Sequence, residues 1–270
     1  PIADDDRASS GYLVWVDGKA RAMIDAGNGS LLRFAEAGAR FEDLDFVGLS
    51  HFHTDHSSDF PALLKSGNFS PRRRALRVAG PAGSARFPSL DNYLEGLLNP
   101  ETGIYRYLAG YLDGSRGLVK LEPRTVSGDE PERVLERGSA GLIVDALPVP
   151  HGIVPAVAFR VSIDSRVIVF GSDQTLSNPA YVDFAKNADL LIAHMVIPEG
   201  ATGRSTELHA TPSAIGRTAK AIGAETLLLS HFMARSLRDL DGNVAAVRDR
   251  YAGRIVLASD LECLPVGGGD

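Results

Sequence analysis

The sequence predicts an α/β fold that forms one domain over residues 1–270. Short apolar runs of strand length alternate with segments of helical spacing, the pattern of α/β proteins. Of the 270 residues, 44% are hydrophobic, which is enough to bury a sizeable core. No internal repeat or low-complexity linker divides the chain, so one domain is favoured over two.

The strands are predicted from short apolar runs, several of them bounded by turn residues. Asp17-Gly18 makes a hairpin of the first two runs, and Asp164-Ser165 does the same for a later pair. The runs at 190–193 and 226–230 are continuously apolar, as in strands buried on both faces. In chain order the predicted strands are 12–16, 22–25, 44–50, 141–149, 157–163, 166–170, 190–193, 226–230 and 255–257.

Helices are predicted between these strands from apolar spacing and end signals. Gly38 is placed to end the first helix, and Thr211-Pro212 begin a later one as N-cap and first helical residue. A helical insertion is predicted around 84–115, whose aromatic side chains either line a pocket or pack as an ordinary cap on the core. The other predicted helices are 30–37, 60–65, 211–222 and 244–251.

The charge of the chain argues against a broad nucleic-acid interface. The net charge is -6 and the sequence pI is about 5.7, whereas phosphate neutralisation needs a basic face. One dense basic run, Arg72-Arg73-Arg74 with Arg77, is either a solvated loop or a phosphate-steering segment.

The single cysteine, Cys263, excludes a thiolate zinc site of the CxxC type and a disulfide within the chain. No apolar stretch approaches the roughly 18 residues of a membrane span, and no signal peptide is present. The compartment is left open between cytoplasm and periplasm, and a homo-oligomer is compatible with the sequence.

The segment from His51 to His56, His-Phe-His-Thr-Asp-His, is the most informative part of the chain. It places three imidazoles and one carboxylate directly after a predicted strand. This donor set suits zinc, with iron or manganese as alternatives. His51 and His53 can face one side, while Asp55 and His56 lie around the turn and can face a second ion. A His-rich surface loop without metal is the alternative, but it does not explain the position at a strand end.

Three further candidates also follow predicted strands. They are His151, Asp173 and His231. Open α/β folds gather ligands at the carboxyl ends of their strands, so these residues can converge on the first motif.

In this order, the series resembles the metallo-β-lactamase-fold superfamily, and 23–27 also match its early Asp-x-Gly strand. The resemblance covers nearly the whole chain. It implies an αββα sandwich of two mixed sheets flanked by helices, with two divalent metal ions at one edge. It further implies that one ion is held by His51, His53 and His151, the other by Asp55, His56 and His231, and that Asp173 bridges them.

A narrower resemblance is to the ribonuclease Z and arylsulfatase-like branch, through 208–212 and 228–232. The branch's His-Glu-Ala-Thr motif is absent, and His194 is followed by Met195. Many tRNA-processing members place a long basic arm between the residues matching His151 and Asp173, whereas here 152–172 hold only a predicted hairpin. This argues against tRNA as the substrate. The family's opening strand has no counterpart before residue 12, so we expect the natural protein to begin earlier, and a leader is compatible with that.

The sequence therefore predicts a dinuclear hydrolase that uses a metal-bridging hydroxide on a small ester, favouring a phosphodiester or sulfate ester over a lactone. Asp55 and His209 are the candidate catalytic residues. His209 precedes an electropositive helix N-terminus and is a candidate oxyanion or leaving-group partner, with a structural turn-capping role as the alternative. His194 is a second oxyanion candidate. Alternative functions are a ribonuclease Z-like tRNA 3′ endonuclease, a mononuclear-iron redox enzyme of the same fold, or a binding module with a structural metal.

Overall fold

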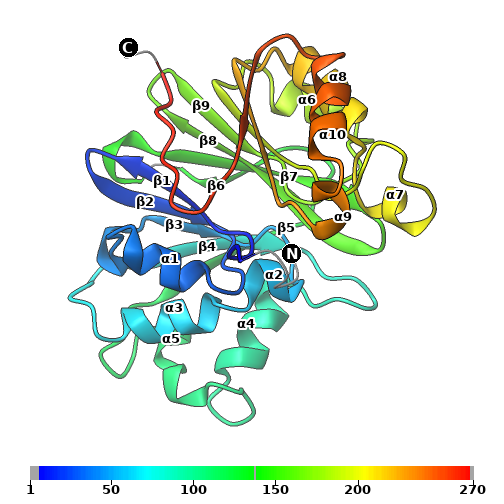
Figure 1. Ribbon diagram of the computed structural model, residues 1–270. Helices are drawn as coiled ribbons and strands as arrows, with labels where there is room; N and C mark the ends of the chain where they lie inside the picture. The colour runs from blue at the N-terminus through cyan, green and yellow to red at the C-terminus, as the bar shows by residue number, and fades with distance from the viewer. Residues whose placement is uncertain (1–5, 137, 268–270) are drawn as a thin grey trace.

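Two mixed β-sheets lie face to face, and helices cover the outer face of each sheet (Figure 1). The computed structural model describes residues 6–136 and 138–267. The four layers are those of an αββα sandwich, so the predicted fold is confirmed.

The first sheet has the strand order β1-β2-β3-β4-β5. β1 and β2 form the predicted antiparallel hairpin, and the pairs from β2 to β5 are parallel. The sequence did not predict β4 or β5. β5 is an edge strand that contains Pro123 and has three consecutive exposed residues, so it lacks apolar alternation. The strands are β1 (Tyr12–Val16), β2 (Lys19–Ile24), β3 (Phe46–Gly48), β4 (Leu76–Pro81) and β5 (Leu121–Val126).

The second sheet has the strand order β12-β11-β10-β9-β8-β7-β6. The pairs from β6 to β9 are antiparallel, and those from β9 to β12 are parallel. β6 is a short edge strand that the sequence did not predict. The strands are β6 (Glu132–Leu135), β7 (Ile143–His151), β8 (Val154–Ile163), β9 (Arg166–Phe170), β10 (Leu190–His194), β11 (Thr226–Ser230) and β12 (Arg254–Leu257).

Two aromatic rings fill the core between the sheets beside β3. The rings of Phe46 and Phe159 pack edge to face with their centroids 5.7 Å apart. A Cβ atom at Gly48 would lie 2.9 Å from the Phe159 ring, so only glycine allows this close approach. The end of β3, from which the His-rich segment continues, is therefore held firmly against the second sheet.

Helices α1, α3, α4 and α5 cover the first sheet, and α6, α8 and α10 cover the second (Figure 1). Three short helices, α2, α7 and α9, lie close to strand ends. The bounds are α1 (Ser30–Glu36), α2 (Thr54–Ser57), α3 (Phe60–Gly67), α4 (Leu90–Leu98), α5 (Gly110–Asp113), α6 (Ala180–Phe184), α7 (Arg204–Leu208), α8 (Pro212–Ile222), α9 (Ala234–Leu237) and α10 (Leu240–Arg248).

The predicted helical insertion contains α4 and α5, and two of its aromatic side chains, Tyr93 and Tyr111, pack as a cap on the core. Tyr93 stacks on Phe52 with ring centroids 4.4 Å apart, and its hydroxyl donates to the Ser57 carbonyl at 2.9 Å. Tyr111 is fully buried and donates to the Leu64 carbonyl at 2.7 Å. For these two residues the packing alternative holds rather than the pocket alternative.

α8 begins where the sequence predicted, with a different cap, whereas α10 begins earlier than predicted. Thr211 is the N-cap of α8, but its side chain makes no cap hydrogen bond. The carboxylate of Glu199 instead accepts from the Ser213 amide at 2.7 Å. α10 begins before the predicted residue 244, because the Asp239 carboxylate accepts from the Gly242 amide at 3.1 Å.

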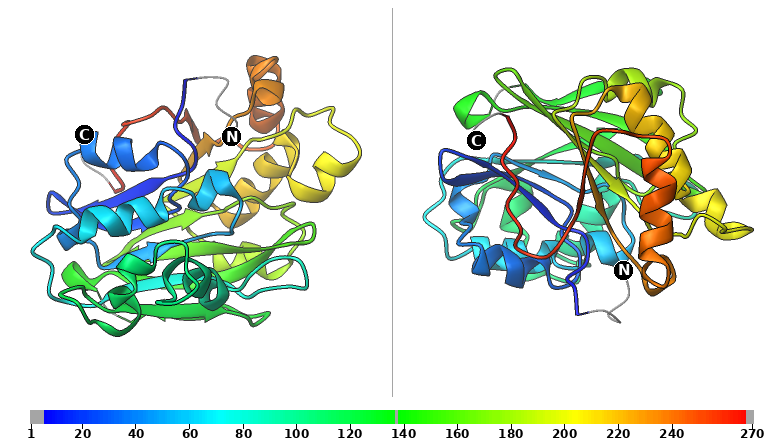
Figure 2. Two further views of the ribbon diagram at one scale, coloured as in Figure 1. Left: turned by 90° about the horizontal axis from the view of Figure 1, so that it is seen from below. Right: turned by 45° about the horizontal axis from the view of Figure 1, so that its top comes forward.

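The C-terminal segment after β12 crosses back to the first sheet (Figure 2). Asp260 accepts from the Arg33 guanidinium at 2.8 Å and from the Ala8 amide at 3.0 Å. The segment thereby joins the two halves of the sandwich.

Candidate metal centre

The His-rich segment leaves β3 as a loop and then turns into α2. β3 ends at Gly48, so the strand predicted over 44–50 is shorter than expected. His51 Nε2 nevertheless lies 3.0 Å from His53 Nδ1, with His51 fully buried and His53 partly buried. The two imidazoles therefore share one side, as their spacing predicted.

Asp55 and His56 lie on α2 and meet His231, which follows the end of β11. His56 Nε2 is 2.9 Å from His231 Nε2. The Asp55 carboxylate lies 3.5 Å from His231 Nε2 and 3.9 Å from His56 Nε2. This set is separate from the pair His51 and His53 but adjacent to it.

Asp173 stands between the two sets. Its Oδ2 atom lies 3.7 Å from His56 Nε2 and 3.8 Å from His151 Nε2, and its Oδ1 atom lies 3.7 Å from His231 Nε2. One carboxylate thus approaches imidazoles from both sides.

The donor atoms form groups that fit divalent metal ions. One group is His51, His53 and His151, and another is Asp55, His56 and His231; in each group the donor atoms lie within 4.8 Å of one another. His151 Nε2 is buried and has no hydrogen-bond partner in the described part of the chain, while its Nδ1 lies 2.7 Å from the Leu208 carbonyl. A buried imidazole that is anchored by one nitrogen and open at the other is arranged as a metal ligand.

Burial and mutual repulsion keep several of these imidazoles neutral. Desolvation, followed by the neighbouring His56, lowers the pKa of His51 well below its ordinary value. Desolvation also lowers the pKa of His53 and His151. Desolvation alone would raise the pKa of Asp173, but His231, His194 and His56 together hold it well below its ordinary value. Neutral His51, His53 and His151 beside an ionised Asp173 are in the protonation states that bind metal. His56 differs: desolvation alone would lower its pKa, but Asp25 and the other neighbouring carboxylates raise it.

A buried carboxylate that the sequence analysis did not select supports the second set. Asp25 Oδ2 lies 2.7 Å from His56 Nδ1 and accepts from the hydroxyls of Ser10 and Ser50 at 2.9 and 3.0 Å. Its Oδ1 accepts from the Ser50 amide at 2.8 Å. Asp25 therefore orients the His56 ring through the nitrogen that faces away from Asp173. The Asp-x-Gly motif, in which Asp25 is the aspartate, was the sequence signal that could have identified it.

Left-handed backbone conformations also gather here. Asp25, Ser172 and His231 have φ angles of 61°, 62° and 54°, which non-glycine residues seldom adopt. Such strain persists only where the surrounding structure enforces it, and it clusters at functional sites.

His209 lies at the edge of the centre, just before α8. Its Nδ1 atom is 3.8 Å from Asp173 Oδ2, and its ring centroid is 5.1 Å from that of His151. Nδ1 is buried without a hydrogen-bond partner among the described residues, and desolvation lowers the pKa of His209 to about 3. His209 is thus a neutral imidazole that faces the metal ligands.

His194 contacts Asp173 and lies between it and Tyr12 of the first sheet. Its Nδ1 atom is 2.6 Å from Asp173 Oδ1, and its Nε2 atom is 3.1 Å from the Tyr12 hydroxyl. Both ring nitrogens are engaged, which favours a supporting role over the oxyanion role that the sequence suggested.

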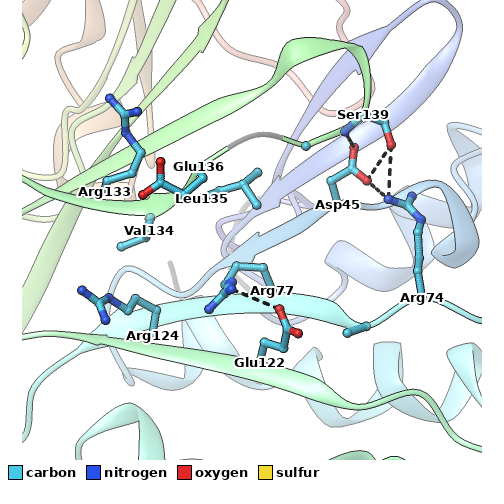
Figure 3. Close-up of a pocket in the computed structure, with 12 residues that line it drawn as sticks. Asp45, Arg74, Arg77, Glu122, Arg124, Arg133, Val134, Leu135, Glu136 and Ser139 are labelled. Carbon is cyan, nitrogen blue, oxygen red and sulfur yellow. Dashed lines mark hydrogen bonds and ion pairs between the residues drawn. The ribbon is translucent and has the colours of Figure 1, made fainter.

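The basic run near residue 72 is not part of this centre. Arg72 is buried and donates to the Arg74 carbonyl at 2.8 Å, so it is neither solvated nor free to steer a phosphate. Arg74 pairs with Asp45, and Arg77 pairs with Glu122 at 3.0 Å (Figure 3). They line a pocket next to the first residue of β3, at the opposite end of that strand from His51.

With this geometry established, comparison with known proteins decides the family. The family model of the β-lactamase superfamily domain matches residues 20–232. The chain belongs to the β-lactamase superfamily. As a superfamily member it is a metallo-β-lactamase-fold hydrolase, and membership implies divalent metal ions as cofactors.

Relatives place the β-lactamase superfamily chain near the ribonuclease Z branch. It is 28% identical to a protein named Ribonuclease Z from Mycobacterium marinum, over 98% of this chain and 95% of that one. Its fold is similar to that of the metallo-β-lactamase fold protein YhfI from Bacillus subtilis, with a TM-score of 0.71 and 23% identity over 96% of this chain and 91% of the other. It is also similar to human tRNase Z, short form, with a TM-score of 0.69 and 18% identity over 96% and 93%. Among the described residues, no helix is long and apolar enough to cross a membrane.

Proposed function

We propose that this chain hydrolyses phosphodiester bonds with two divalent ions, preferably zinc, and that RNA is the first substrate class to test. The observation that carries the proposal is the position of Asp173, whose carboxylate approaches imidazoles of both ligand sets. Two neighbouring ions that share one carboxylate are typical of hydrolytic two-metal centres.

The residues present fit such a pair of ions. His51, His53 and His151 would hold one ion, Asp55, His56 and His231 the other, and Asp173 would join them. When bound, the pair supplies a nucleophile at neutral pH and polarises the phosphoryl oxygen.

The protein's own groups would orient the substrate around this centre. His209 faces the ligands as a neutral imidazole beside the N-terminus of α8, which is electropositive. We assign it to the oxyanion or the leaving group. Asp55 is the least buried of the second set, and we therefore place the substrate on its side.

Relatives support RNA as the first substrate to test. A protein named Ribonuclease Z aligns over 98% of the chain. The acidic net charge had argued against nucleic acid, but an overall charge does not exclude a local contact, and the relatives do not support that exclusion.

A small phosphodiester is the second candidate, and one observation favours it. Between His151 and Asp173 the chain forms only the hairpin of β8 and β9, which pair from Phe159 with Phe170 to Ile163 with Arg166. This hairpin offers no long arm to hold the body of a tRNA. Small sulfate esters and lactones are further candidates, because they too need no arm to hold a large substrate.

The test combines metal analysis with turnover. The protein purified without added metal is analysed for zinc, iron and manganese, then assayed with bis-p-nitrophenyl phosphate and with an RNA that carries a 3′ trailer. We expect about two zinc ions per chain and cleavage of both substrates. Cleavage of the small diester alone would favour the second candidate. Iron without turnover of either substrate would contradict the proposal and favour the redox alternative.

Two variants separate ligands from substrate contacts. Asp173→Asn should lose metal and activity together, because the shared carboxylate is removed. His209→Ala should keep its metal and lower kcat by about 100-fold, in the range expected for one oxyanion contact. Loss of metal from His209→Ala would instead make His209 a ligand.

A further inference from the structure

A chain of hydrogen bonds runs behind Asp173, away from the other ligands. Asp173 Oδ1 lies 2.6 Å from His194 Nδ1, and His194 Nε2 lies 3.1 Å from the Tyr12 hydroxyl. That hydroxyl in turn lies 2.7 Å from Ser230 Oγ. The proposed hydrolysis involves neither Tyr12 nor Ser230 directly, so the role of this series of hydrogen bonds needs another explanation.

The chemistry of these groups decides which atom donates and which accepts in each hydrogen bond of the series. An ionised carboxylate only accepts, so His194 Nδ1–H donates to Asp173. The neutral ring then has an unprotonated Nε2 atom, which accepts from the Tyr12 O–H. The Tyr12 oxygen is left to accept from the Ser230 hydroxyl. Each polar group is satisfied only in this arrangement, and it fixes the tautomer of His194.

These hydrogen bonds also connect parts of the fold that are distant in sequence. Tyr12 belongs to β1 in the first sheet and lies 182 residues from His194 and 218 residues from Ser230. His194 and Ser230 are register partners on β10 and β11 of the second sheet. Ser230 immediately precedes His231, so one hydroxyl from the first sheet reaches the supports of two proposed ligands.

We propose that Tyr12 is a positioning residue for the metal centre, acting through His194 on Asp173 and through Ser230 on the strand end that carries His231. With Oδ1 held by His194, Oδ2 is the atom presented to His56 and His151. The tilted contact of the Tyr12 ring with Phe170, with centroids 5.6 Å apart, limits the movement of the hydroxyl. Partners of this kind behind a ligand tune affinity by about 10–100-fold. The inference rests on the proposed role of Asp173 as a ligand.

The first test is Tyr12→Phe, which removes one oxygen and keeps the ring. Zinc affinity is measured by competition with a chromophoric chelator, and the absorption of the cobalt(II)-loaded protein is recorded. We expect affinity to fall about 10–100-fold and the cobalt spectrum to change. The matched control is Tyr251→Phe, whose hydroxyl donates to the Ala224 carbonyl at 3.0 Å on another part of the fold. The control should leave both measurements unchanged.

The second test asks whether Tyr12 acts through His194. In a His194→Ala background, Tyr12→Phe should cause a smaller loss of zinc affinity than in the parent, because only the path through Ser230 remains and coupled residues are not additive. His194→Asn should bind zinc more tightly than His194→Ala, since the asparagine amide can take the place of Nδ1 beside Asp173.

The proposal is overturned if Tyr12→Phe binds zinc within twofold of the parent, or if its effect is undiminished in the His194→Ala background. A purely structural role would lower the stability of the metal-free protein more in Tyr12→Phe than in Tyr251→Phe and leave zinc affinity unchanged. A parent that binds zinc but cleaves no phosphodiester would overturn only the proposed substrate, because affinity does not depend on turnover. A parent that binds no zinc would overturn both.

Discussion

Single residues around the centre divide into donors that face the metal positions and groups that hold those donors. The donors were visible in the sequence because histidines and aspartates follow the strands closely. The holding groups were not, because a Tyr or Ser in a strand carries no signal of its partner. Asp25 is intermediate, since a motif marked its position but not its role.

Asp25→Asn is the sharpest residue-level test of this division. The new amide would place a donor where Asp25 Oδ2 now accepts from two serine hydroxyls and faces His56. We expect zinc affinity to fall by about 10–100-fold, as for other supporting partners. Isothermal titration of the metal-free protein measures it.

The matched control is Asp189→Asn. Asp189 accepts from the Val167 amide at 2.7 Å and pairs with Arg166 at the other end of β10. Equal losses of zinc affinity in both variants would mean that the effect is general destabilisation rather than support of His56.

At the scale of elements, the reliable predictions were those made from local signals. The hairpin of β1 and β2 follows from its turn residues. α1 ends at Glu36, two residues before Gly38, whose positive φ of 75° is easily adopted only by glycine. Two edge strands, β5 and β6, were missed because their exposed polar side chains break the apolar pattern, and the interior strand β4 was missed as well. The start of α8 was located correctly, but its cap comes from Glu199 in a preceding loop.

Glu199→Ala tests this cap. The Ser213 amide would lose its acceptor at the helix start, so we expect the free energy of unfolding to fall by about 1 kcal/mol. Urea denaturation of the metal-free protein followed by circular dichroism gives the value. Glu130→Ala, which removes an exposed carboxylate from a surface turn, should be neutral. No difference between the two variants would argue that water caps α8 equally well.

For the whole molecule, the centre joins both sheets, so metal binding should stabilise the entire sandwich. His51 and His56 follow β3 of the first sheet. In the second sheet, His151 is the last residue of β7, and Asp173 and His231 follow β9 and β11. An ion with ligands from both sheets must be released before the two sheets can separate.

Metal removal should therefore lower the melting temperature. Zinc at about 1,000 times its Kd contributes about 4 kcal/mol to the folded state, which corresponds to a rise of roughly 8–16 °C for a chain of this size. Calorimetry before and after chelation, and after zinc is restored, measures it. Asp173→Asn should show a much smaller response; a melting temperature insensitive to zinc in the parent protein would contradict a centre that spans the sheets.

The sequence by itself determined the fold class, the family resemblance and the order of the proposed ligands. The fold class depends on local periodicity. The ligands were recognisable because few roles other than metal binding gather histidines and aspartates at strand ends. Only the tertiary structure decided which groups stand behind those ligands. Tyr12, His194 and Ser230 meet because two sheets close on each other, and Asp25 reaches His56 because β2 lies beside β3. Contacts between distant segments depend on the packing of the whole chain, and no local pattern encodes them.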